Sequence, residues 1–245
     1  GLGNMVRHVG RRDEARLLLR DALAMYRELG DARGEAATTG NLGNILFSEN
    51  RLAEAEPLYR RAHELCRQTG DRVGEAAGAV NLGAVHIALG RLAEARASLE
   101  RGIALCRELG ERTYESVATS SLGELAHSEG SVAEARALFE RQLEMSRELG
   151  DRTGDSIGLL RLGRLSRDTG DLERAEQHLR ACVAACRAAR AKRREATALR
   201  ELGSLLLARS GGDEGRTELL AARDLARVTA SPTDEVLALC ELAAR

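Results

Sequence analysis

Hydrophobic and polar residues follow one another along this chain with the spacing of amphipathic helices. Between residues 52 and 66 the apolar or small side chains are separated by steps of three and four, which places them on one helical stripe. These residues are Leu52, Ala55, Tyr59, Ala62 and Cys66. Arginine and glutamate occupy the opposite face, as on a helix with one solvated side. Because the stripe returns at residues 92–106, 132–146 and 172–186, the pattern predicts a helix in each segment.

The stripe is part of a longer unit that repeats every 40 residues. Residues 71–110 contain GEAA, NLG, LAEA and RELG. Residues 31–70 keep GEAA, NLG, LAEA and the closing glycine, and residues 111–150 have SLG, AEAR and RELG at the same spacing. Self-similarity at one fixed period is typical of a repeat array. We therefore interpret the chain as one all-α array of about six units, with partial units at both ends. The expected units are 1–30 (partial), 31–70, 71–110, 111–150, 151–190, 191–230 and 231–245 (partial).

Each unit is predicted to contain two helices, called helix A and helix B. Gly30-Asp31 and Gly70-Asp71 mark the boundaries between units, because glycine ends one helix in the left-handed conformation and aspartate caps the next. Asn50 is expected to end the helix A that begins after Asp31. A partial helix A at residues 2–9 and a helix B at 11–29 come first. Both chain ends align with helix interiors, so we expect the chain to be a segment of a longer polypeptide.

Composition excludes several classes of function. Hydrophobic residues make up 43% of the chain and aromatic residues 2%, which favours a core of leucine and alanine. The formal net charge of −1 argues against a nucleic-acid partner, which would need a basic face. No segment resembles a membrane span or a signal peptide. The five cysteines show no disulfide-like spacing, which favours a reducing compartment and a cytoplasmic location.

Small residues recur where the two helices of a unit are expected to meet. Helix A carries Leu-Gly at residues 2–3, 42–43, 82–83, 122–123, 162–163 and 202–203. Helix B carries an alanine every 40 residues, at Ala15, Ala55, Ala95, Ala135 and Ala175. Glycine inside a helix costs about 1 kcal/mol relative to alanine, so its recurrence indicates that a Cβ would hold the paired helices apart. Over essentially its whole length the chain resembles the tetratricopeptide repeat family.

The resemblance has a particular form. The usual repeat has about 34 residues, whereas this unit has 40 and carries Asn-Leu-Gly-Asn in helix A. It is similar to the repeats of Pins-type polarity adaptors and kinesin light chains, and to arrays beside regulatory domains in bacterial proteins such as STAND-type regulators. The arginine-rich composition favours the bacterial setting. The resemblance implies a right-handed α-α superhelix whose A helices line a concave groove for a peptide or a partner helix.

Candidate binding residues follow from the A helices. An asparagine side chain can pair with both the N–H and the C=O of a peptide backbone, so we expect Asn4, Asn41, Asn44 and Asn81 to form a backbone clamp. Hydrogen bonding between neighbouring helices is an equally good interpretation of the same four residues. Both alternatives stay open at this point.

The later A helices are more strongly charged. Glu124 and four arginines are expected on the same concave face, the arginines being Arg161, Arg164, Arg167 and Arg200. Guanidinium groups bind carboxylates in a forked geometry, so these arginines predict a site for an acidic partner segment. The alternative, slightly favoured, is a solvated face on which the arginines pair with Glu124, Asp168 and Glu201.

The chain offers little for catalysis or metal binding. Cys66, Cys106 and Cys186 share one repeat position, which indicates a packing role, and the histidines are scattered. No P-loop, nucleophile elbow or HExxH motif is present. We expect no cofactor, no metal and no enzymatic activity, and we interpret the chain as a protein-interaction scaffold. Two alternatives are a regulatory or self-associating region, joined through its ends, of a larger signalling protein, and the substrate-recognition arm of an enzyme.

Overall fold

The computed structural model describes residues 12–210, 212–229 and 232–243, and every secondary-structure element in these ranges is an α-helix. The helices are α2 (Arg12–Glu28), α3 (Ala32–Ser48), α4 (Leu52–Gln68), α5 (Arg72–Ala88), α6 (Leu92–Leu109), α7 (Arg112–Ser128), α8 (Val132–Glu148), α9 (Arg152–Asp168), α10 (Leu172–Ala188), α11 (Lys192–Ser210), α12 (Asp213–Val228) and α13 (Pro232–Ala243). The helical pattern predicted from the sequence is confirmed over these ranges. The expected helix at residues 2–9 lies outside them.

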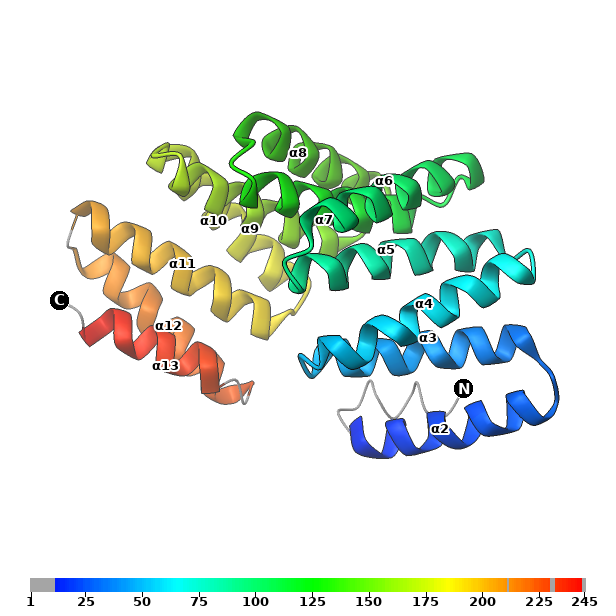
Figure 1. Cartoon of the computed structure of the whole chain (residues 1–245). Helices are drawn as coiled ribbons and strands as arrows, with labels where there is room; N and C mark the ends of the chain where they lie inside the picture. The colour runs from blue at the N-terminus through cyan, green and yellow to red at the C-terminus, as the bar shows by residue number, and fades with distance from the viewer. Residues whose placement is uncertain (1–11, 211, 230–231, 244–245) are drawn as a thin grey trace. The chain divides into compact units, whose positions relative to one another are not determined.

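The helices form two compact units, residues 1–125 and 126–245, and the boundary between them falls inside α7. In the first unit, α2 packs against α3, α3 against α4, α4 against α5, and α5 against α6 (Figure 1). The second unit repeats this arrangement from α8 to α13. Odd-numbered helices are the A helices of the repeat and even-numbered helices are the B helices. That residues 1–245 form one continuous array stays a prediction.

The turns between helices have the predicted conformations. The side chains of Asp31 and Asp71 accept hydrogen bonds from the backbone N–H of Gly34 (3.0 Å) and Gly74 (2.9 Å), so each aspartate caps the helix A that follows it. Asn50 ends α3 with a φ of 59°. This left-handed conformation is one that asparagine tolerates better than most residues.

The small residues allow the helices of a unit to approach closely, as the sequence predicted. A Cβ placed on Gly83 would lie 2.5 Å from Cγ of Leu99, and one on Gly203 would lie 2.8 Å from the carbonyl oxygen of Gly215. The recurrent alanines of the B helices are fully buried, as in the cases of Ala55 and Ala95. The core is therefore built from leucine and alanine between closely paired helices.

An ion pair recurs at the turn from helix B to the next helix A. An arginine in the last turn of the B helix donates to an acidic residue in the first turn of the A helix, eight positions later. The donor–acceptor distances are 3.3 Å for Arg27–Glu35, 2.8 Å for Arg107–Glu115, 3.0 Å for Arg147–Asp155 and 2.8 Å for Arg187–Glu195. Each acidic residue also lies at the positive end of its helix dipole, where negative charge is favourable.

Candidate functional site

A cavity of about 250 Å³ opens in the first unit, lined by residues of α3, α4 and α5 and by Tyr114 of α7. Asn41 and Asn44 contribute to it from α3, and Asn81 contributes from α5. The structure thus brings together three of the four asparagines predicted from the sequence. The fourth, Asn4, lies outside the described residues.

The cavity exists because two facing positions are both small. A Cβ placed on Gly40 would lie 3.8 Å from Cβ of Ala62, which is an ordinary van der Waals distance. One repeat later the same two positions hold Val80 and Gly102, and a Cβ on Gly102 would lie only 3.0 Å from Cγ2 of Val80. Valine therefore fills the space that Gly40 leaves open. Neither position stands out within one repeat, but a position-by-position comparison of residues 31–70 with residues 71–110 shows the exchange.

The three asparagines differ in how they are held. The hydroxyl of Tyr59 donates to Oδ1 of Asn44 at 2.9 Å. Burial raises the pKa of Tyr59, so the phenol stays protonated and remains a donor. Asn41 and Asn81 are half-buried, and neither side chain forms a hydrogen bond with another residue in the described part of the chain. Bonding to a neighbouring helix thus describes Asn44, whereas Asn41 and Asn81 keep their amide groups available.

The cavity has little net charge. Its charged lining residues are Arg33 and Asp71. Asp71 is the N-cap of α5, and Nη2 of Arg33 donates to the carbonyl oxygen of Thr69 at 3.5 Å. One positive and one negative group, each engaged by the fold, leave an environment suited to uncharged polar groups such as a peptide backbone.

Three of the four predicted arginines in the second unit converge on one buried carboxylate, that of Glu201 in α11. Nε and Nη2 of Arg164 donate to its Oε1 at 3.1 and 2.8 Å, Nη2 of Arg200 donates at 2.9 Å, and Arg167 donates to Oε2. Burial acts to raise the pKa of Glu201, but the three guanidinium groups outweigh it and hold that pKa below its usual 4.5.

Further contacts engage these arginines. Arg200 also donates to Glu241 at 2.7 Å, and Arg167 pairs with Asp168 at 3.2 Å. Arg161 lies over the ring of Phe139, 5.9 Å from its centroid. Glu124 is exposed on α7. The contacts of Arg164, Arg167 and Arg200 with Asp168 and Glu201 agree with the interpretation of a face of paired charges. Pairing with Glu124 and binding of an acidic partner by the same arginines stay predictions.

The buried cysteines occupy packing positions. Cys106, Cys182 and Cys186 are fully buried, and Sγ of Cys182 donates to the carbonyl oxygen of Ser156 at 3.2 Å. Burial raises the pKa of the Cys106 thiol to about 11, which keeps it protonated. Among the described residues, no group of three or more His, Cys, Asp or Glu side chains is placed to hold a metal ion. None of the described helices is long and apolar enough to cross a membrane.

Comparison with known proteins identifies the class of this chain. The family model described as "Tetratricopeptide repeat" matches residues 1–68, 34–108 and 114–188. The chain belongs to the tetratricopeptide repeat family. A search of curated protein sequences found no match.

Solved structures with the same fold agree with the resemblance seen in the sequence. The nearly identical repeats of a kinesin light chain-like protein from Podosopora anserina match with a TM-score of 0.62 and 18% identity, covering 79% of this chain and 95% of that one. A STAND protein from Pyrococcus horikoshii with a tetratricopeptide repeat sensor gives a TM-score of 0.70 at 12% identity, over 98% of this chain and 40% of that one. The all-α tetratricopeptide solenoid predicted from the sequence is confirmed.

A third similar structure contains a bound peptide. The Rap conjugation gene regulator of plasmid pLS20, in complex with the Phr* peptide, gives a TM-score of 0.68 at 13% identity. The match covers 81% of this chain and 54% of the regulator. The chain thus spans about half of the Rap regulator and less than half of the STAND protein. At these identities, the three structures establish the fold.

Proposed function

We propose that the chain is a non-catalytic protein-interaction scaffold, and that the cavity of the first unit holds the backbone of an extended peptide or partner segment. The observation that carries this proposal is the meeting of Asn41, Asn44 and Asn81 in one neutral cavity. Asn41 and Asn81 stand at equivalent positions of successive repeats, so their amides present the same groups one repeat apart. Such a row suits a ligand that itself repeats, as a peptide backbone does.

The mechanism follows from the groups that line the cavity. Each free amide supplies one carbonyl acceptor and two N–H donors, which match the N–H and C=O of an extended peptide. Gly40 has no side chain, so a ligand can come close to the backbone of α3. Tyr59 holds Asn44 in place before the ligand arrives. A cavity formed in advance spares the protein the cost of ordering its own side chains on binding.

The Rap regulator supports this proposal, because it has the same fold and was solved with a peptide bound. A match at 13% identity transfers no binding residue, so the proposal rests on the asparagines of this chain. An acidic preference of the partner belongs to the proposal as well.

A displayed library of random peptides tests the proposal. The library is panned against the full 245-residue chain, and enriched peptides are synthesised and measured by isothermal titration calorimetry. Two lost hydrogen bonds of about 0.5–1.5 kcal/mol each should weaken binding to Asn41→Ala/Asn81→Ala about tenfold or more. The control Gln68→Ala/Gln177→Ala removes two exposed amides elsewhere and should bind as the wild type does.

A second variant fills the cavity with a side-chain contact that already occurs elsewhere in the fold. Gly40→Val/Ala62→Gly copies the Val80–Gly102 pair of the following repeat, so the fold already contains its template. This variant should stay folded and lose the peptides. Enriched peptides that bind the wild type and both cavity variants equally well would show that the site lies elsewhere, and a library without enriched peptides would refute the proposal.

A further inference from the structure

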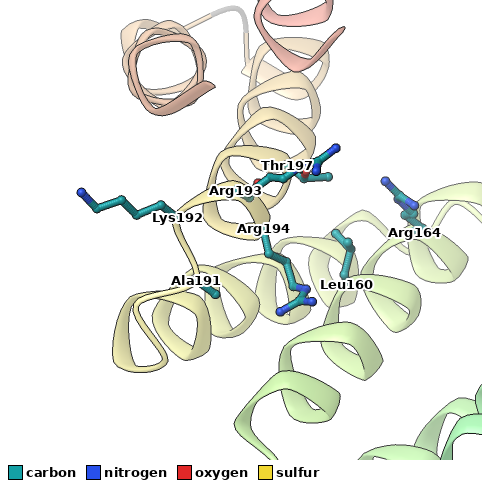
Figure 2. Close-up of a pocket in the computed structure, with 7 residues that line it drawn as sticks. All are labelled: Leu160, Arg164, Ala191, Lys192, Arg193, Arg194 and Thr197. Carbon is teal, nitrogen blue, oxygen red and sulfur yellow. The ribbon is translucent and has the colours of Figure 1, made fainter. Parts of the chain in front are cut away.

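A second cavity, of about 640 Å³, lies in the second unit and is lined by residues of α9 and α11 (Figure 2). Four cationic side chains, Arg164, Lys192, Arg193 and Arg194, contribute to its lining together with the apolar side chain of Leu160. Among the described residues that line the cavity, none is acidic. Its size is within the range of about 300–1,000 Å³ that is usual for ligand sites.

Lys192 lacks the carboxylate partner that Arg72 has at the equivalent repeat position. Arg72 stands at the equivalent position three repeats earlier, and its Nη2 donates to Oε2 of Glu108 at 2.8 Å. Val228 occupies the position equivalent to Glu108, so the repeat of Lys192 offers no carboxylate there. Lys192 and Arg193 are exposed, and neither forms an ion pair or side-chain hydrogen bond with another residue in the described ranges.

The nearby carboxylates are engaged by other groups. Glu195, in the first turn of α11, accepts from Nε of Arg187 at 2.8 Å. Glu201 accepts hydrogen bonds from Arg164, Arg167 and Arg200, so the guanidinium group of Arg164 already has a carboxylate partner. Nη1 of Arg194 lies 3.4 Å from the hydroxyl oxygen of Ser156, a neutral group. The positive charges of three successive residues, 192 to 194, are therefore not balanced by a carboxylate of the fold.

These three cations stand where a helix tolerates positive charge poorly. They occupy the first turn of α11, at the positive end of the helix dipole. The A helices α3, α5 and α9 begin after an aspartate whose side chain caps the helix, whereas Ala191 has no acceptor to offer. An anionic group bound here would neutralise the side chains and interact favourably with the helix end.

We infer that this cavity binds an acidic segment of a partner protein, with an apolar side chain against Leu160 and several separate carboxylates around it. Figure 2 shows the side chain of Lys192 pointing away from those of Arg194 and Arg164. One compact dianion cannot contact all of these diverging groups, whereas a segment with several carboxylates can. A nucleic acid would require cations continued over a larger surface, and the chain as a whole has a net charge of −1. The inference rests on the proposed function, because it defines the chemistry of the partner.

Fluorescence anisotropy with two synthetic peptides tests the inference. One peptide places a leucine among aspartates and glutamates, and the other replaces these by asparagine and glutamine. The full chain should bind the acidic peptide at least about tenfold more tightly, and Lys192→Glu/Arg193→Glu should lose about the same factor. The control Arg20→Glu/Arg216→Glu makes the same change in net charge at two exposed arginines outside the cavity and should keep the wild-type affinity.

Three results would overturn the inference: equal affinity for both peptides, an unchanged affinity of Lys192→Glu/Arg193→Glu, or competition by a single-stranded oligonucleotide as effective as that by the acidic peptide. The two proposals fail separately. If library peptides still depend on Asn41 and Asn81 while the acidic peptide does not bind, the acidic site alone is refuted. If the acidic peptide binds as expected and no peptide depends on these asparagines, the first cavity is refuted.

Discussion

Gly40→Ala should stabilise the protein, although Gly40 lines the candidate peptide-binding cavity. Gly40 lies within α3, and glycine in a helix interior is about 1 kcal/mol less favourable than alanine. The added Cβ would contact only Cβ of Ala62, at 3.8 Å, so no steric cost offsets the gain. We expect the free energy of unfolding to rise by about 0.5–1 kcal/mol. In a chain of this size, each kcal/mol corresponds to a melting temperature about 2–4 °C higher.

Urea denaturation followed by far-ultraviolet circular dichroism measures this change. Gly78→Ala is the matched control, because Gly78 lines the same cavity and also lies inside a helix. A Cβ on Gly78 would lie 2.9 Å from Cβ and 3.0 Å from Cα of His63, so the control should lose stability. A lower unfolding free energy for Gly40→Ala, or the same change in both variants, would refute the argument that packing leaves space at Gly40.

The same variant separates stability from binding. If a ligand backbone approaches α3 at Gly40, the methyl group of Gly40→Ala occupies part of its path. Library peptides should then bind the more stable protein less tightly. A gain in both stability and affinity would place the ligand away from Gly40, even if the stability prediction holds.

Three further predictions concern buried groups. Glu201→Gln should lower the free energy of unfolding by about 2–3 kcal/mol in urea denaturation, because it leaves three guanidinium groups without their shared carboxylate. Since the folded-state pKa of Glu201 lies below its usual 4.5, its stabilisation is present above that pH and is lost as the pH falls through the folded pKa; Glu201→Gln should lack this acid-dependent part. Tyr59→Phe should cost about 1 kcal/mol in the same assay by leaving Oδ1 of Asn44 without its donor, and an unchanged midpoint would show that this hydrogen bond contributes nothing. Titration with a thiol reagent should modify Cys240 first in the native protein and the four buried cysteines after unfolding; rapid reaction of a second thiol would contradict their burial.

The fold was predictable because its determinants are local and repeated. Each helix boundary is encoded within a few residues, as at Gly70-Asp71, where the left-handed glycine and the capping aspartate both appear in the structure. The helical stripes need only steps of three and four. Forty-residue periodicity then presents the same pattern several times, so irregular positions such as Ala191 do not obscure the arrangement.

The candidate sites were less predictable, because they depend on pairs of residues far apart in the sequence. Asparagines in one repeat position indicated a binding surface, but the available space depends on Gly40 facing Ala62, 22 positions later. The unbalanced positive charges near α11 were still harder to predict from the sequence. Nothing near Lys192 in the sequence shows that Val228 replaces its acidic partner, and this becomes visible only when the contact between Arg72 and Glu108 is known. A missing side chain, such as the carboxylate that Val228 lacks, is harder to recognise in a single sequence than a functional group that is present.

The facing positions occupied by Gly40 and Ala62 form a slot, a space between two helices that is filled by different side chains in different repeats. The chain holds valine and glycine there in the next repeat, and leucine and cysteine at 160 and 182, so the surrounding helices accept contents of very different volume. A small residue at this position, such as Gly40 in place of valine, opens the slot beside asparagines that are already present, so no new functional group is needed. Val80→Gly with Gly102→Ala would copy the empty slot one repeat further and lengthen the cavity. If the proposed function holds, such exchanges would change the length of the ligand that this chain accepts in steps of one repeat, while each repeat keeps its caps and ion pairs.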